Sequence, residues 1–196
     1  MQLGWAGVEL FYVISGFLIT RILLRSREGP RYLRTFYLRR GLRILPIYWL
    51  ALIGALGIAA ASGLWSGVLG FVPFYLGYAQ NYYPQMASSF KAGIPYLAHT
   101  WTLAIEEQFY WFWPLALLLF TGRRLLVLVG FLFVSAPFVR VLLLEWTGNP
   151  FALFATLPSQ ADGLAAGAAL AILIHWEFRS CGCVAWAGSL CWSVGP

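Results

Sequence analysis

The chain has 196 residues, of which 61% are hydrophobic and only 10% are charged, and its mean hydropathy is +0.75. A soluble domain is roughly 45–50% apolar and about 25% charged, so this composition excludes a soluble globular domain, a disordered region and a coiled coil. The net charge of +6 does not indicate a nucleic-acid partner, because the arginines lie between apolar blocks and not over a soluble face. The composition predicts an all-α, polytopic transmembrane helical bundle whose first partner is the lipid bilayer.

Five stretches are long and apolar enough to cross a bilayer core of roughly 30 Å at about 1.5 Å per residue. In chain order they are residues 3–24, 44–61, 101–120, 125–144 and 151–174. The stretch 65–79 is shorter and contains Pro73, so a span, a re-entrant segment and an interfacial helix are all compatible with it. We therefore expect about five to six hydrophobic helices in one domain over residues 1–178, followed by an irregular tail over 179–196.

Positive charge gives the orientation of these spans. Eight of the 13 Lys and Arg residues lie between Arg21 and Arg43, and the positive-inside rule places that stretch in the cytoplasm. The same rule places Arg123, Arg124 and Arg179 inside, which requires that 65–79 does not fully cross. We expect a multi-pass protein of the inner (plasma) membrane, with the first span running from outside to inside.

Two adjacent glutamates, Glu106 and Glu107, lie within the predicted span 101–120. Ionisable groups at membrane depth are costly, so by default they face a cavity or a partner. Successive residues differ by about 100° around a helix, so the two carboxylates cannot share one face. Glu106 shares its face with His99 and Tyr110, which makes these three the candidate catalytic residues. The alternative is that both glutamates pair structurally with arginines.

Three arginines, Arg39, Arg40 and Arg43, lie on adjacent faces of one helical turn just before the predicted span 44–61. Guanidinium groups bind phosphates in a bidentate manner and stay charged, so this turn is the candidate site for the phosphates of a cofactor. Anchoring to anionic lipid, at about 1 kcal/mol per basic residue, is the alternative.

Other polar residues in the apolar blocks carry weaker signals. Glu9 and Ser15 lie in the first predicted span and are candidates for substrate binding, although the Ser15–Gly16 pair also suits close helix packing. Arg140 and Asp162 are two further charges within spans and could pair with each other. The three cysteines, Cys181, Cys183 and Cys191, lack the paired spacing of a zinc site, so no metal is expected.

Three segments together resemble the membrane acyltransferase 3 family. Residues 7–20 (GVELFYVISGFLIT) resemble its GVDLFFVLSGFLIT signature, residues 39–48 resemble its RR-x-x-RI-x-P-x-Y segment, and residues 99–110 (HTWTLAIEEQFY) resemble its WSLSVEEQFY segment. The order and the spacing of the segments also agree, and Pro114 follows as in the family. Weaker similarity continues through residues 157–167.

The resemblance implies an integral membrane O-acyltransferase of the cell envelope. Such enzymes take an acyl group, commonly acetyl, from acyl-CoA and place it on a hydroxyl of a carbohydrate or a glycolipid. It also implies that Arg40 and Arg43 bind the phosphates of the donor, and that Glu106 supports activation of the acceptor.

The sequence departs from the family in ways that affect this expectation. The family's first helix, with its Arg and its presumed catalytic His, has no counterpart here, and His99 is not its equivalent. Ala104 and Thr102 replace motif serines, and Gln160 stands where an arginine is common. We therefore expect a fragment without that helix and without the C-terminal part, inactive by itself. A component of a transporter or channel and a structural subunit without chemistry are the other hypotheses.

Overall fold

The computed structural model describes residues 2–82, 93–94, 96–150 and 152–180. Over these residues the chain is helical and contains no strand, which confirms the all-α prediction. The long helices are α1 (Gln2–Ser26), α2 (Tyr32–Ala61), α6 (Trp101–Leu119), α7 (Arg123–Thr147) and α9 (Ala161–Ser180). Short helical pieces connect them: α3 (Trp65–Val68), η1 (Leu69–Phe71), α4 (Val72–Leu76), η2 (Gln80–Tyr82), η3 (Ala98–Thr100), α8 (Ala152–Ala155) and η4 (Pro158–Gln160).

Three of these helices are long and apolar enough to cross a membrane: Ala6–Ser26 within α1, Tyr32–Ala61 and Arg123–Thr147. The full helices α1, α2 and α7 include the predicted spans 3–24, 44–61 and 125–144. Helix α6 coincides with the predicted span 101–120 and carries Glu106 and Glu107, but it is not one of these three. The membrane class inferred from composition therefore agrees with the lengths of the helices.

Two predicted boundaries are wrong. Helix α2 begins at Tyr32 and not at residue 44, so the arginine-rich stretch is itself helical, and 30 residues give a rod about 45 Å long. The predicted span 151–174 is not one helix, because α8 ends at Ala155 and Pro158 starts a separate turn before α9. Proline lacks the N–H that would continue the earlier helix. The predicted tail, apart from the end of α9 at Ser180, lies outside the described residues.

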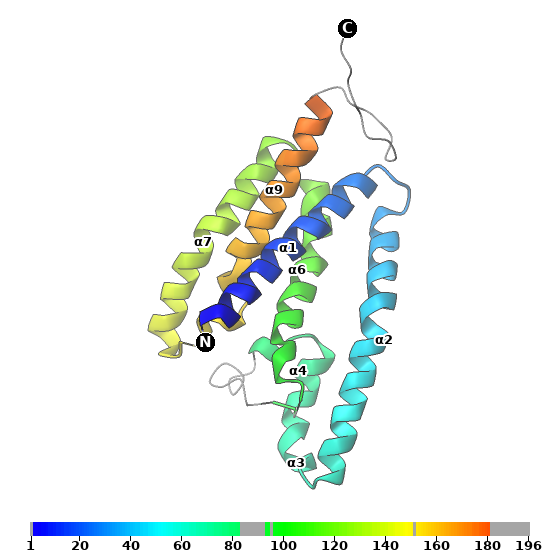
Figure 1. The fold of residues 1–196 in the computed structure, drawn as a ribbon, viewed down its shortest axis with the longest axis vertical. Coiled ribbons are helices and arrows are strands. Elements are labelled where there is room, and N and C mark those ends of the chain that lie inside the picture. Colours follow the sequence, from blue (N-terminus) through cyan, green and yellow to red (C-terminus); the bar gives the residue numbers. More distant parts are fainter. Residues whose placement is uncertain (1, 83–92, 95, 151, 181–196) are drawn as a thin grey trace.

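The segment 65–79 forms the short pieces α3, η1 and α4 instead of one long helix. They turn back beside α2 (Figure 1), and the Tyr48 hydroxyl in the middle of α2 donates a hydrogen bond to the Tyr75 carbonyl of α4 over 2.7 Å. This path is in keeping with the re-entrant placement that the charge pattern favours.

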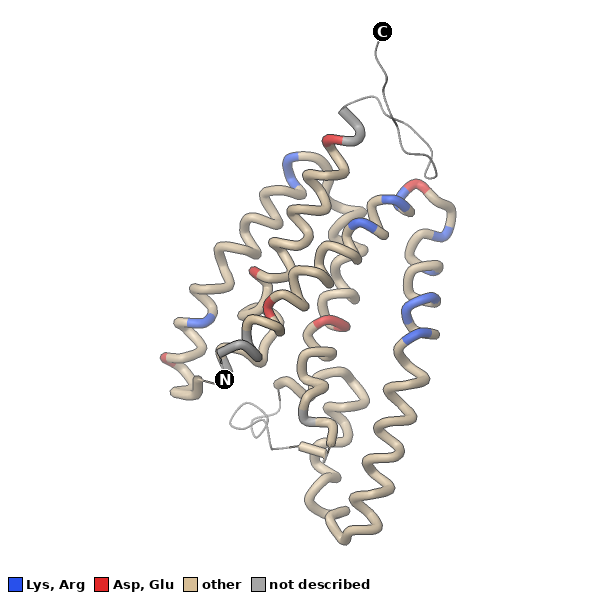
Figure 2. The backbone as a smooth tube through the Cα atoms, viewed as in Figure 1, with Lys and Arg blue, Asp and Glu red and all other residues tan. Residues whose placement is uncertain are grey.

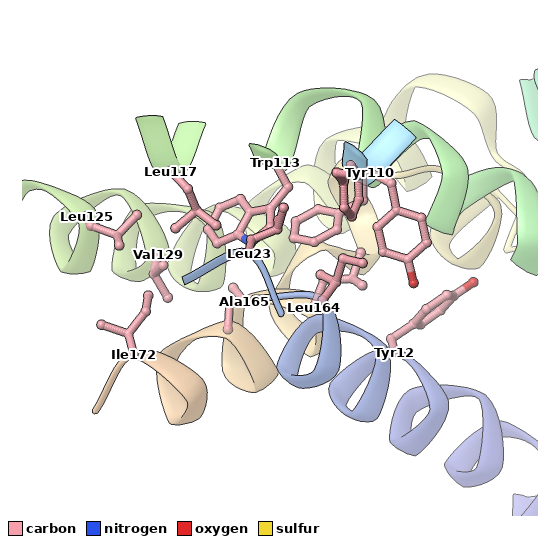
Figure 3. Packing of buried hydrophobic residues seen from close by; sticks show 14 of the residues in the cluster. Tyr12, Leu23, Tyr110, Trp113, Leu117, Leu125, Val129, Leu164, Ala165 and Ile172 are labelled. Atoms are coloured by element: carbon pink, nitrogen blue, oxygen red, sulfur yellow. The ribbon is translucent and has the colours of Figure 1, made fainter. Parts of the chain in front are cut away.

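Helix α1 crosses α9, with α7 and α6 packed beside them, whereas α2 stands at the side of the bundle (Figure 1). Glycines allow the crossing, because a Cβ at Gly16 would overlap the backbone of Leu164 and a Cβ at Gly167 would overlap the backbone of Val13. This confirms the prediction that Gly16 serves close helix approach. Next to the crossing, buried side chains of α1, α6, α7 and α9 interlock, among them Leu23, Trp113, Leu117, Val129 and Ile172 (Figure 3).

Cationic residues gather at one end of the bundle (Figure 2). The end of α1, the beginning of α2 and the beginning of α7 meet there, so we call it the arginine end. The Arg27 Nη2 atom donates to the Leu118 carbonyl over 3.4 Å, which places the last turn of α6 at the same end. One end of the bundle thus concentrates the positive charge, as the predicted cytoplasmic side requires.

Candidate active site

A carboxylate cluster forms where α1 meets α6. The Ser15 hydroxyl donates a hydrogen bond to Glu106 Oε1 and also contacts the Tyr110 hydroxyl. Glu106 and Tyr110 are buried, with 4% and 2% of their surfaces exposed. Tyr12 of α1 is fully buried, and Figure 3 shows its side chain next to that of Tyr110. We call Tyr12, Ser15, Glu106 and Tyr110 the carboxylate cluster.

Local helical geometry and one long-range contact build this cluster. Glu106 and Tyr110 are four residues apart on α6, so their side chains lie on one face. Ser15 precedes Gly16, which brings α1 close to α9 and so fixes the position of α1. The serine that the sequence offered for either substrate binding or packing therefore touches the carboxylate itself.

Glu107 faces a different neighbour. Its Oε1 atom lies 3.3 Å from Arg40 Nε of α2, and both side chains are mostly buried, at 12% and 22% exposure. The same guanidinium lies over the Tyr110 ring, with the guanidinium carbon 3.4 Å from the ring centroid, as in a cation–π contact. This confirms that Glu106 and Glu107 face apart, and it makes Arg40 the link between α2 and the carboxylate cluster.

An arginine cavity of about 600 Å³ lies between the arginine end of α1 and the first three turns of α2. Its lining is the set Ile19, Ile22, Arg25, Ser26, Gly29, Pro30, Tyr32, Thr35, Phe36, Arg39, Arg40 and Arg43. Arg39 and Arg43 are exposed and make no salt bridge with a described residue, so their charges are free for an anionic ligand. The predicted spacing thus does bring Arg39, Arg40 and Arg43 to one hollow, whose chemistry suits phosphate groups.

Two predicted site residues lie apart from this centre. Glu9 is exposed on α1, nearer to the opposite end of the bundle than Ser15. His99 is exposed in η3, just before α6, where it lines a separate cavity. Seven residues of helix separate His99 from Glu106, about 10 Å along the axis. A shared helical face therefore does not bring these two side chains together, and the catalytic role of His99 stays a prediction.

Sequence reasoning overlooked a buried amide network on a third face of α6. Gln108 Nε2 donates to the Tyr78 carbonyl over 2.7 Å and to Asn81 Oδ1 over 2.9 Å. Gln80 Nε2 donates to the Thr100 carbonyl over 3.0 Å. Two adjacent amide residues, Gln80 and Asn81, are unusual in so apolar a chain, and they are the sequence feature that could have predicted this network.

The remaining intramembrane charges pair as the sequence allowed. Arg140 Nη2 lies 2.8 Å from Asp162 Oδ1, and Arg140 Nε donates to the Ser159 carbonyl over 2.8 Å. Within the described ranges, no three His, Cys, Asp or Glu side chains gather as a metal site. The three cysteines lie outside those ranges.

Comparison with known proteins identifies the family of the chain. The family model of the acyltransferase 3 domain, described as an acyltransferase domain, matches residues 2–195. The peptidoglycan O-acetyltransferase OatA of Listeria monocytogenes is 30% identical over 200 residues, which cover 90% of this chain and 30% of that protein. The Bacillus subtilis protein YrhL is 30% identical over 190 residues, with the same two coverages. The chain therefore spans about a third of the length of these relatives. No solved structure matches it.

Proposed function

Because the chain belongs to the acyltransferase 3 family, we propose that it carries the donor-binding part of a membrane O-acyltransferase. The reaction moves an acyl group, acetyl in the simplest case, from acyl-CoA to a hydroxyl of a carbohydrate or glycoconjugate of the cell envelope. We place the protein in the inner membrane as a multi-pass bundle, with residues 1–178 as one domain and the arginine end toward the cytoplasm.

The position of Arg40 carries this proposal. Arg40 lines the arginine cavity, pairs with Glu107 and covers the ring of Tyr110. Tyr110 in turn meets Ser15, which donates to Glu106. A donor that fills the arginine cavity therefore lies next to a buried carboxylate, because Arg40 reaches from the cavity lining to the ring of Tyr110. Lipid anchoring alone does not explain why one of the arginines points into the bundle.

The chemistry that we assign to this centre is acyl transfer from a thioester. The hydroxyl oxygen of the acceptor bonds to the carbonyl carbon of the donor, and the carbon–sulfur bond breaks. Glu106 takes the proton of the acceptor hydroxyl as general base and passes it to the thiolate that leaves, so the products are an ester and free CoA. Ser15 and Tyr110 orient the carboxylate through their hydroxyls.

The acceptor approaches, in this proposal, from the end of the bundle opposite to the arginines. Glu9 and His99 are exposed toward that end and are its candidate contacts. OatA, one of the relatives, is a peptidoglycan O-acetyltransferase. A peptidoglycan-like carbohydrate is therefore the acceptor that we propose to test first.

The decisive experiment is binding of radiolabelled acetyl-CoA to the chain in phospholipid nanodiscs. We expect Arg40→Ala to lower the affinity at least tenfold, because the guanidinium contacts both the donor and Glu107. Arg34→Ala is the matched control, since Arg34 is an exposed arginine of α2 outside the arginine cavity. Equal affinities of the wild type and both variants would overturn the donor-binding role.

A further inference from the structure

A second hollow lies along α2 beyond the arginine cavity. This apolar groove measures about 720 Å³ and runs between α2 and the segment that leads into α6. Its α2 wall extends from Arg43 to Ile58 and includes Ile47, Ala51 and Gly54, and Leu103 of α6 is on the facing wall. Among the described residues that line the groove, the titratable side chains are Arg43 at one end, His99 and two tyrosines, and most of the others are apolar, so the lining suits a nonpolar chain.

The groove and the arginine cavity are arranged end to end along one helix. The arginine cavity uses α2 residues 32–43, the groove uses residues 43–58, and Arg43 lines both. At about 1.5 Å per residue the two stretches measure about 16 Å and 22 Å along the helix axis. A single ligand with an anionic end and an apolar end matches this order of linings.

We propose that the apolar groove holds the acyl chain of a donor longer than acetyl-CoA. The inference rests on the proposed function and places the CoA phosphates at the α1 end of the arginine cavity, which Arg25 lines, so that the pantetheine arm spans the rest of the cavity and the thioester lies near Arg43. From that point, a chain that follows α2 leaves the arginine end and enters the groove directly. Acyl-CoA arrives from water, so moving its methylene groups into an apolar groove is favourable.

Two glycines of α2 give a matched pair of variants. A Cβ at Gly54 or at Gly57 meets no atom within 4 Å, so both positions accept a larger side chain without a clash. Gly54 lines the groove and Gly57 does not. Gly54→Leu therefore fills the groove, whereas Gly57→Leu adds the same side chain to the same helix elsewhere.

The experiment measures displacement of labelled CoA from the chain in nanodiscs of one zwitterionic phospholipid, by acetyl-, octanoyl- and decanoyl-CoA. We expect Gly54→Leu to bind acetyl-CoA like the wild type but decanoyl-CoA at least fivefold more weakly than Gly57→Leu does. Partition of the decanoyl chain into the bilayer is common to all variants and cancels in this comparison. Ala51→Phe, which also projects into the groove, serves as a second filled variant if Gly54→Leu does not fold.

The outcomes separate the two proposals. If Gly54→Leu and Gly57→Leu bind each acyl-CoA equally, the groove does not hold the acyl chain and is filled by membrane lipid, while donor binding in the arginine cavity stands. If CoA without an acyl chain does not bind the wild type, both proposals are overturned. Chain-length selectivity that depends on Gly54 supports the groove as the acyl site.

Discussion

Helices are held together in different ways in two regions of the molecule. One region is the crossing of α1 and α9, and the other is helix α2 with its neighbours, which we call the α2 arm. At the crossing, Gly16 and Gly167 let backbones touch, and an added Cβ would overlap the neighbouring helix. Along the outer half of α2, Gly54 and Gly57 face open space. Side chains and polar contacts hold α2 instead: Leu52 and Ala59 are buried in one cluster with residues of the short helical pieces, Tyr48 donates a hydrogen bond to α4, and Arg40 pairs with Glu107.

The difference shows how a membrane bundle can be both rigid and hollow. Helices in lipid associate through close packing and polar contacts, because burying apolar side chains against each other gains little there. The crossing brings backbones into contact and fixes Ser15, while the α2 arm is held through side chains, apolar and polar, and leaves room for a ligand on both sides of Arg43. The candidate active site lies where these two regions meet.

The largest effect is expected from disturbing the crossing. Gly167→Leu drives a side chain into the Val13 backbone, and overpacking against backbone costs more than the typical ~1–3 kcal/mol. We expect little folded protein in membranes, measured as the monodisperse peak in size-exclusion chromatography after detergent extraction. Gly57→Leu is the control and should match the wild type. A wild-type peak for Gly167→Leu would show that the backbones of α1 and α9 are not in contact at Gly167.

A smaller loss of stability is expected from the ion pair between α7 and α9. Arg140→Met leaves Asp162 without its partner, and each side chain is about a quarter exposed, so we expect a loss of about 1–3 kcal/mol. Thermal unfolding in detergent, followed by tryptophan fluorescence, measures it. The double variant Arg140→Met/Asp162→Leu should recover part of the loss. If the two single effects simply add, the pair does not couple the helices.

Loosening the α2 arm should change ligand binding as well as stability. Glu107→Gln removes the charge that pairs with Arg40 in a mostly buried site, so we expect acetyl-CoA affinity to fall severalfold, with a loss of unfolding free energy of about 1–3 kcal/mol. Equilibrium binding in nanodiscs and thermal unfolding measure the two quantities. Glu145→Gln, at an exposed carboxylate of α7, is the control. A large loss of stability with unchanged affinity would assign Glu107 a purely structural role.

The smallest effect is expected from a single tether of α2. The Tyr37 hydroxyl donates to the Trp111 carbonyl over 2.8 Å at an exposed position, so Tyr37→Phe should cost about 0.5–1 kcal/mol. A melting temperature a few degrees lower in detergent would show it. Tyr96→Phe, at another exposed tyrosine, is the control and should leave the melting temperature unchanged. Equal shifts for the two variants would show that the hydrogen bond from Tyr37 to Trp111 does not stabilise the protein.

Local sequence signals predict the helices better than their ends. Long apolar runs located α1, α6 and α7 closely, because the bilayer demands a fixed length of apolar chain. The same reasoning missed the start of α2 at Tyr32, since arginines form helix as readily as apolar residues do once they lie outside the bilayer core. It also joined α8 to α9 across Pro158, because the interruption of the helix there depends on the fold around it.

The candidate site was predictable only in part, for a related reason. Helical spacing placed Glu106 with Tyr110 and separated it from Glu107, because both relations are local to one helix. The contacts of Ser15 with Glu106 and of Arg40 with Glu107 join residues 91 and 67 positions apart. Periodicity carries no information on which helices meet. The buried amide network of Gln108 and Asn81 was missed on the same ground.

The meeting of two hollows at Arg43 has a consequence for electrical insulation. Cavities that follow one helix from the arginine end toward the opposite end would, if filled with water, shorten the barrier that the bilayer presents to ions. A fixed guanidinium at the junction repels protons and metal cations, as arginine does in pores that pass neutral solutes. We therefore expect the residue that would guide an anionic donor inward to limit the leakage of cations as well.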